Sequence, residues 1–119
     1  MKILIAVAAL TVSGSVFAQA AEDPIAVYVA KARLAYRVAN VDRTEVQSVQ
    51  PYYDAAMAAA KSADERKAIA LHWAAVKSCV SQSGRQYGED YADQRARLQP
   101  CEDKMADRVA EIQAAGYGN

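Results

Sequence analysis

The chain has 119 residues, 53% of them hydrophobic, and its 14 Lys and Arg residues balance its 14 Asp and Glu residues. A chain of this length folds as one domain, whose small core gives marginal stability unless a cross-link helps. The near-neutral charge argues against a nucleic-acid binder and against a polybasic membrane binder, because both need clustered positive charge.

The N-terminus has the layout of a secretory signal peptide. Lys2 precedes an apolar run over residues 3–12, and an A-x-A cleavage motif follows at residues 18–20. We therefore expect residues 1–20 to be removed, which leaves residues 21–119 as a single helical domain with one net negative charge. This part has no run of about 18 apolar residues, so we expect no membrane span and a periplasmic or secreted protein.

The first helix of the mature chain is expected to begin at Asp23-Pro24, where the aspartate caps and the proline fits the first turn. Asn40 marks its expected end. One apolar face consists of Ile25, Tyr28, Val29, Ala32, Ala35, Tyr36 and Ala39. A second apolar strip consists of Val27, Leu34 and Val38. We interpret this strip as buried between neighbouring helices, with an exposed partner-binding strip as the alternative.

The middle of the chain contains further helix signals. Residues 42–45 read as a capping box for a short helix that Pro51 ends or bends. In residues 51–80, Ser62 with Glu65 three positions later either starts a second helix or lies within one long helix, and both alternatives stay open. The core stripe of this segment consists of Ile69, Trp73, Val76 and Val80.

Two glycines, Gly84 and Gly88, interrupt the helical pattern after this stripe. Glu89-Asp90 are expected to open a short helix that Pro100 ends or bends. The last helix then ends at Gly116. Its buried face consists of Cys101, Met105, Val109 and Ile112.

These elements predict an all-α fold, a small bundle of three to five helices clasped by one disulfide. The only two cysteines, Cys79 and Cys101, lie 22 positions apart. Export to an oxidising compartment favours a disulfide over free thiols or metal ligands. The bond is expected to join the C-terminal end of one helix to the N-terminal end of the next. Closing a loop of this length stabilises a fold by about 3 kcal/mol.

No residue is assigned to catalysis, to a cofactor or to a metal. The chain lacks C-x-x-C, H-E-x-x-H, G-x-S-x-G and a phosphate-binding glycine loop. The only histidine, His72, is interpreted as a bundle residue beside Trp73. A b-type haem held by His72 and either Met57 or Met105 is the less favoured alternative.

A row of carboxylates follows the last helix at four-residue spacing: Asp103, Asp107 and Glu111. An acid pair or a calcium site is conceivable there. Lys104 and Arg108 accompany the row, so we interpret it as a solvated charged face.

The candidate partner-binding residues are Arg85, Tyr87, Tyr91, Arg95 and Arg97, which lie between the cysteines. Tyrosine and arginine are enriched in interface hot spots, because they combine contact area with directional hydrogen bonds. Tyr87 and Tyr91 share a helical face if this piece is helical. The alternative is that both tyrosines cap the small core under a long loop.

The second half of the chain resembles the C-terminal part of the LprI-like family of exported helical proteins, over about 40 residues. The shared features are a Trp-then-Cys helix, a glycine-containing loop, and a second Cys followed by an Arg and an acidic-apolar pair. In this chain they correspond to Trp73, Cys79, Gly84 or Gly88, Cys101, Arg108, Glu111 and Ile112. Because some members are linked to lysozyme inhibition, the resemblance implies a lysozyme-inhibitor-like role.

These observations favour a non-enzymatic exported helical protein that acts by binding another macromolecule, either a protein or a cell-envelope component. The lysozyme-inhibitor-like role is the alternative. A small all-α enzyme or haem carrier is less favoured, because the usual motifs are missing. The oligomeric state stays open.

Overall fold

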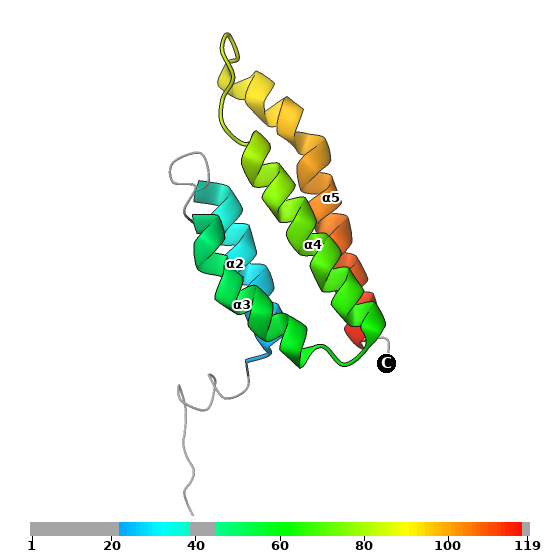
Figure 1. Cartoon of the computed structure of the whole chain (residues 1–119). Coiled ribbons are helices and arrows are strands. Elements are labelled where there is room, and N and C mark those ends of the chain that lie inside the picture. Colours follow the sequence, from blue (N-terminus) through cyan, green and yellow to red (C-terminus); the bar gives the residue numbers. More distant parts are fainter. Residues whose placement is uncertain (1–21, 39–44, 118–119) are drawn as a thin grey trace, which may run out of the picture.

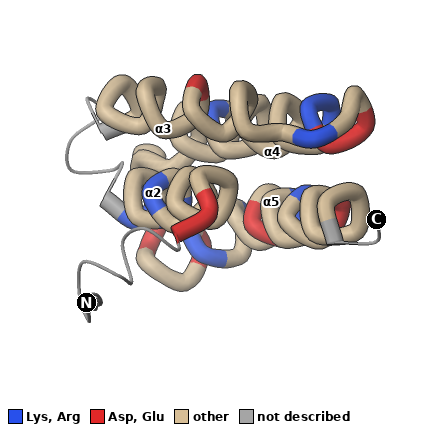
Figure 2. The backbone as a smooth tube through the Cα atoms, turned by 90° about the horizontal axis from the view of Figure 1, so that it is seen from below, with Lys and Arg blue, Asp and Glu red and all other residues tan. Residues whose placement is uncertain are grey.

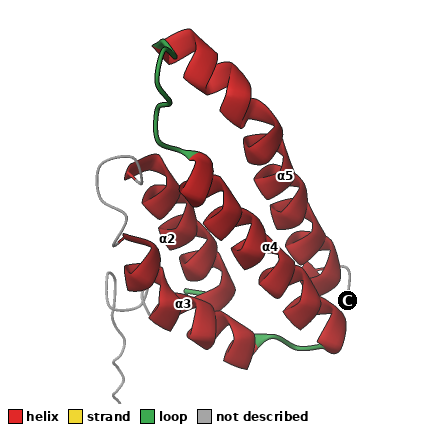
Figure 3. Cartoon of the chain, turned by 45° about the horizontal axis from the view of Figure 1, so that its top comes forward, coloured by secondary structure: helices red, strands yellow, loops and turns green. Residues whose placement is uncertain are grey.

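The computed structural model describes residues 22–38 and 45–117, and within them every regular element is an α-helix (Figures 1 and 3). The helices are α2 (Pro24–Val38), α3 (Glu45–Ala59), α4 (Ala63–Gln82) and α5 (Tyr91–Tyr117). The predicted all-α class is confirmed. The predicted signal peptide at residues 1–20, the expected helix end at Asn40 and most of the expected capping box, residues 42–44, lie outside the described residues.

The described helices form two antiparallel hairpins, in which α2 packs along α3 and α4 packs along α5. α4 also contacts α2 and α3, which joins the hairpins. Seen end on in Figure 2, α3 lies beside α4 in one layer and α2 lies beside α5 in the other. This is the arrangement of an up-down-up-down four-helix bundle.

The start of α2 agrees with the prediction. The Asp23 carboxylate accepts a hydrogen bond from the Ile25 N–H at 2.9 Å, and its carbonyl accepts one from the Val27 N–H at 3.0 Å. Pro24 occupies the first helical position, where no intrahelical N–H donor is needed. The cap and the proline together fix where the helix begins.

Pro51 does not end a helix. The expectation of a short helix up to Pro51 is wrong, because α3 continues through it to Ala59. Val49 and Ala56, one on each side of the proline, are both buried. Pro51 itself is exposed, so the carbonyl that loses its N–H donor lies on the side where water can replace it. Packing of both halves outweighs the lost hydrogen bond.

A new helix starts after Ser62, which decides between the two alternatives for residues 51–80. The Ser62 hydroxyl accepts a hydrogen bond from the Glu65 N–H at 3.1 Å. In return, the Glu65 carboxylate accepts one from the Lys61 N–H at 2.8 Å. This reciprocal arrangement is a variant of the capping box, reaching one residue further back than usual.

The core centres on an aromatic cluster from α2, α3 and α4. The Tyr28 ring packs edge-on against Tyr53, His72 and Trp73, and Tyr53 stacks on Trp73 with ring centroids 5.6 Å apart. Aliphatic side chains surround it. The other buried members of the core are Ile25, Ala32, Ala35, Val49, Ala56, Ala68, Ile69, Val76, Val80 and Ile112. The predicted apolar faces of α2 and α4 are thus confirmed where they are described.

The second apolar strip of α2 is not buried as a whole. Leu34 is 54% exposed, so its interpretation as a buried residue is wrong, whereas Val27 is half-buried. The reason is that α2 packs on α3 and α4 through the face that contains Tyr28, and Leu34 projects outside that contact. The side chain of Val38 lies outside the described residues.

α5 is a single long helix that includes Pro100. The expected end of a short helix at Pro100 is therefore wrong, and the alternative of a bend at Pro100 stays a prediction. Leu98 before the proline and Ile112 after it are both buried, while Pro100 is exposed. As in α3, contacts on both sides of the proline keep the helix continuous.

The disulfide links Cys79 on α4 to Cys101 on α5, with 5.7 Å between the two Cα atoms. The predicted pairing is confirmed. Cys79 lies near the C-terminal end of α4, as expected. Cys101, however, lies within α5 and not at its N-terminal end, because residues 91–100 continue the helix beyond the bond. The bond therefore clasps the hairpin below a helical extension.

Candidate functional site

The end of the α4–α5 hairpin projects beyond α2 and α3 (Figures 1 and 3). We call this projection, residues 83–97, the tip. It consists of the connection at residues 83–90 and the first turns of α5. All five candidate partner-binding residues belong to it.

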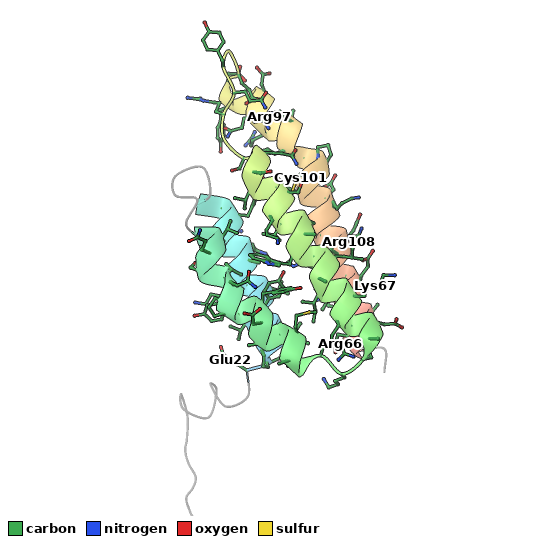
Figure 4. All side chains as sticks on the ribbon, in the orientation of Figure 1. Glu22, Arg66, Lys67, Arg97, Cys101 and Arg108 are labelled. Atoms are coloured by element: carbon green, nitrogen blue, oxygen red, sulfur yellow. A yellow bond between two sulfur atoms is a disulfide. The ribbon has the colours of Figure 1, made fainter. Side chains whose placement is uncertain are left out.

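Arg97 holds the connection onto α5. Its guanidinium donates to both carboxylate oxygens of Glu89, at 2.6 and 3.0 Å. It also donates to the carbonyls of Gln82 at 2.7 Å and of Gly84 at 2.9 Å. Figure 4 shows Arg97 on α5 beside the connection. Because these bonds use all three guanidinium nitrogens, Arg97 serves the shape of the tip and has little left to offer a partner.

Two further contacts fix the connection. The side-chain amide of Gln94, which is buried, donates to the Ser83 carbonyl at 2.7 Å. At the far end, residues 86–89 form a turn in which the Glu89 N–H donates to the Gln86 carbonyl at 3.0 Å. Gly88 in this turn has φ of 80°, a left-handed conformation that glycine adopts without strain.

Asp90 caps α5. Its carboxylate accepts from the Asp93 N–H at 2.8 Å, and its own N–H donates to the Asp93 carboxylate at 3.3 Å. This reciprocal pair satisfies N–H groups that the first turn of a helix leaves open. Negative charge at the N-terminus also suits the helix dipole.

The electrostatics agree with this geometry. Hydrogen bonds from Arg97, followed by one from the Gln86 N–H, lower the pKa of Glu89 to about 2. The same pair raises the pKa of Arg97 above its ordinary value. Both groups are therefore charged at neutral pH, which keeps the Arg97–Glu89 pair intact.

The other four candidates point outward. Tyr87 is fully exposed and Tyr91 is 64% exposed, while Arg85 and Arg95 are also exposed. The Arg95 guanidinium lies over the Tyr91 ring, 5.1 Å from its centroid. Their exposure excludes the alternative that Tyr87 and Tyr91 cap the core. The two tyrosines do not share a helical face, because Tyr87 lies in the connection before α5 begins.

Sequence reasoning missed Glu89 and Gln94 as the partners that order the tip. Glu89 and Arg97 are eight positions apart, a spacing that no helical or hairpin rule links, and the bond forms only because the connection folds back on α5. Gln94 is a polar residue in an otherwise exposed segment, and its burial depends on the Ser83 carbonyl above it. Neither contact has a local sequence signal.

The other groups singled out from the sequence lie away from the tip. Asp103, Asp107 and Glu111 are exposed, Asp103 accepts from Gln99, and Glu111 pairs with Arg108 at 2.8 Å. Figure 4 shows Arg108 on the outer side of α5. Within residues 22–38 and 45–117, no three or more His, Cys, Asp or Glu side chains gather as a metal site would require.

No protein-family model, no curated protein and no solved structure matches the chain. The resemblance to the LprI-like family therefore stays a prediction. In the part of the chain that the structure describes, no helix is both long and apolar enough to cross a bilayer.

Proposed function

We propose that this protein is a non-enzymatic exported binding protein whose tip docks on another macromolecule of the cell envelope. The observation that carries the proposal is the pair of exposed tyrosines at the tip: Tyr87 on a connection that internal hydrogen bonds hold in place, and Tyr91 at the start of α5. Tyrosine is enriched in interface hot spots, and a partner that covers Tyr87 and Tyr91 would gain free energy by removing their apolar surface from water.

The support beneath the tyrosines favours binding. A partner that docks on a flexible loop must order it, which costs free energy for every residue that becomes fixed. Here Arg97 already fixes the carbonyls of Gln82 and Gly84, and the Cys79–Cys101 disulfide fixes the hairpin below them. The tip can therefore bind with little loss of conformational entropy.

The chemistry of the tip favours a protein partner. Tyr87 and Tyr91 offer aromatic area and hydroxyl groups, and Arg85 and Arg95 offer charge-assisted hydrogen bonds. This combination suits a folded protein surface with acidic and apolar groups. The predicted signal peptide would place both partners in the periplasm or outside the cell.

The proposal is tested by photocrosslinking in the native envelope. A benzophenone side chain replaces Tyr87, where full exposure lets the new group be accommodated without repacking. The matched control carries the same group at Tyr52, an exposed tyrosine of α3. We expect a discrete crosslinked protein from position 87 and none from position 52. Tyr91→Ser in the same chain should weaken the crosslink from position 87.

Crosslinks that are the same from both positions, or none from position 87, would mean that the tip is not a docking surface. The LprI-like resemblance suggests lysozyme as one partner to examine directly. Unchanged lysis in a turbidity assay with an excess of the purified protein would reject lysozyme, without deciding whether the tip binds another protein.

A further inference from the structure

Two adjoining hollows lie between α2 and α5. One of ≈ 280 Å³ has residues of α4 among its walls, including His72 and Val76. The other, of ≈ 270 Å³, extends towards the start of α2 and the end of α5. Val29, Arg33 and Val109 line both, so the two hollows form one groove. Figure 2 shows α2 and α5 side by side along it.

Like Glu65 at the far end, His72 is a buried polar residue of this groove. It is only 3% exposed, and its Nδ1 lies 2.7 Å from the Tyr28 hydroxyl. Tyr28 is fully buried, and its hydroxyl has no other partner among the described residues. Because buried hydroxyl groups nearly always donate and Nδ1 is the one acceptor that the described residues place within reach, we assign the Tyr28 hydroxyl as the donor and Nδ1 as the acceptor. The neutral imidazole then carries its proton on Nε2.

The Nε2–H of His72 has no acceptor within the described part of the chain. An unmatched donor on a buried ring costs free energy unless something accepts from it. His72 lines the larger hollow, so the acceptor that the ring lacks has room to enter from the groove.

The mouth of the larger hollow is positively charged. Arg33 and Arg37 line it, and neither makes an ion pair with a described residue. Arg33 is close enough to His72 to help lower the pKa of the imidazole. The carboxylate on the same rim, Glu102, already accepts from the Tyr36 hydroxyl at 2.7 Å. The rim therefore has two cations, Arg33 and Arg37, and one carboxylate, Glu102, which is already hydrogen-bonded.

Apolar side chains make up much of the rest of the groove, with Asp23 and Gln113 among the polar residues of the smaller hollow. Val29 and Met105 line the larger hollow, and Ile25 and Ile112 line the smaller one, with Val109 in both. Lys61 and Glu65 stand at its far end. The groove therefore offers a cationic end with a buried donor beside apolar side chains of α2 and α5. Its two hollows, of ≈ 280 and ≈ 270 Å³, together reach the range of small-ligand sites, roughly 300–1,000 Å³.

From this arrangement we infer that the groove binds a small amphiphilic carboxylate, with its carboxylate between His72 Nε2–H, Arg33 and Arg37 and its apolar chain along Val29 and Val109. This site is separate from the tip. The anion supplies the acceptor that His72 lacks and the counter-charge that the two arginines lack, and the chain covers the apolar walls.

The same residues weigh against the haem alternative from the sequence. Met105 and His72 line one hollow, as a His and Met ligand pair would. Iron, however, binds an imidazole nitrogen through its lone pair, and the Tyr28 hydrogen bond leaves the proton on Nε2. Nε2 is thereby a hydrogen-bond donor to an anion.

Titration calorimetry of the full mature chain with decanoate at neutral pH tests the inference, with decanol as a neutral probe of the same length. We expect saturable binding of decanoate and binding of decanol weaker by about tenfold or more. Equal binding of the two probes, or no saturable binding of decanoate, would overturn the assignment.

Two variants locate the site. The double variant Arg33→Gln, Arg37→Gln is expected to weaken decanoate binding by about tenfold or more, because both cations leave the rim. The double variant Arg85→Gln, Arg95→Gln at the tip makes the same change in net charge and should bind decanoate like the parent. Binding that all variants retain would place the carboxylate elsewhere and overturn the inference.

The ring of His72 provides a readout that does not depend on variants that fold poorly. In ¹⁵N-labelled protein, the imidazole signals should report the Nε2–H tautomer, and decanoate should shift the Nε2 signal. The inference would be overturned by an Nδ1–H tautomer or by an Nε2 signal that decanoate leaves unchanged. Adding haemin to the protein is a separate test. A Soret band that develops only when His72 is present would also overturn the inference.

Discussion

The Arg97 guanidinium on α5 and the Glu89 carboxylate, eight residues earlier in the connection, form a bidentate pair with a shortest distance of 2.6 Å. The same guanidinium binds the carbonyls of Gln82 and Gly84, so one side chain ties the end of α4 and both ends of the connection to α5. The exposed tyrosines of the tip are held in place by this side chain.

Replacing Arg97 should loosen the tip. In Arg97→Gln the Glu89 carboxylate loses both of its guanidinium donors, and the Gln86 to Glu89 turn loses its anchor to α5. We expect the amide protons of Gln86 and Glu89 to exchange with solvent about tenfold faster or more. Hydrogen exchange followed by NMR measures this.

The matched control for that experiment is Arg95→Gln. Arg95 contacts only the exposed Tyr91 ring, so its loss should leave exchange at Gln86 and Glu89 unchanged. If Arg95→Gln speeds exchange as much as Arg97→Gln does, the Arg97 bonds are not what orders the connection.

The two glycines of the connection should respond differently to alanine. Gly88 has φ of 80°, where a Cβ costs about 1 kcal/mol, so Gly88→Ala should lower the free energy of unfolding by about that amount. Gly84 has no positive φ, and no atom lies within 4 Å of the position that an alanine Cβ would take, so Gly84→Ala should be neutral. Urea unfolding of both variants provides the comparison, and equal effects would contradict the turn conformation.

The disulfide should supply a large part of the stability. Reducing it, or replacing both cysteines with alanine, reopens a loop closed over a separation of 22 residues and should lower the free energy of unfolding by about 3 kcal/mol. Urea unfolding with and without a reductant measures the difference. A loss well under 1 kcal/mol would show that packing of α4 on α5 holds the hairpin without the bond.

His72 should make the fold less stable in acid. Burial, followed by the charge of Arg33, lowers its pKa to about 4 from an ordinary 6.5. Between these values the unfolded chain binds a proton that the folded protein does not, so the free energy of unfolding falls as the pH drops from about 6.5 to about 4. The full loss is about 3 kcal/mol. Tyr28, Arg33, Arg37 and Glu102 are the titratable or charged groups around the ring.

The measurement is an NMR titration of the His72 ring, which is the only histidine signal in the spectrum. A midpoint near 4 agrees with the buried position. A midpoint near 6.5 would show that the ring is solvated, and the predicted acid sensitivity would then be absent.

Tyr28→Phe removes the hydroxyl that sets the His72 tautomer. The aromatic contacts with Tyr53 and Trp73 survive, so the expected loss is that of one buried hydrogen bond, about 1–3 kcal/mol. The ring of His72 should then populate both neutral tautomers, visible in its ¹⁵N shifts. An unchanged Nε2–H tautomer would mean that a group other than Tyr28 controls the ring.

Local signals in the sequence predicted much of the fold. The Asp23 and Ser62 side chains start helices because they accept hydrogen bonds from backbone N–H groups of the first turn, and Pro24 fits that turn. These effects depend on nearby residues alone. The apolar stripe around Trp73 was predictable for the same reason. Whether Ser62 acted as a cap could be decided only in the folded chain, where its hydroxyl accepts from the Glu65 N–H.

The prolines misled sequence reasoning because their effect depends on tertiary packing. Pro51 and Pro100 each lie on an exposed face, with buried residues on both sides in the same helix. The disulfide pairing was predictable from the cysteine count and the expected export. Its position within α5 was not, because it depended on α5 continuing through Pro100.

The candidate site was predictable in composition and not in roles. Tyr87, Tyr91 and Arg97 were all selected because tyrosine and arginine are typical of interfaces. The two tyrosines are exposed, whereas Arg97 forms hydrogen bonds within the tip. The groove at His72 combines residues of α2, α4 and α5, which no local pattern links.

The central claim is that the connection that carries Tyr87 is rigid before any partner arrives. Backbone ¹⁵N relaxation of the free, oxidised protein tests it most directly. We predict order parameters for residues 84–90 close to the value of about 0.85 that is typical of rigid backbone. Values below about 0.6 across these residues would contradict the account, because the tip would then have to be ordered by its partner.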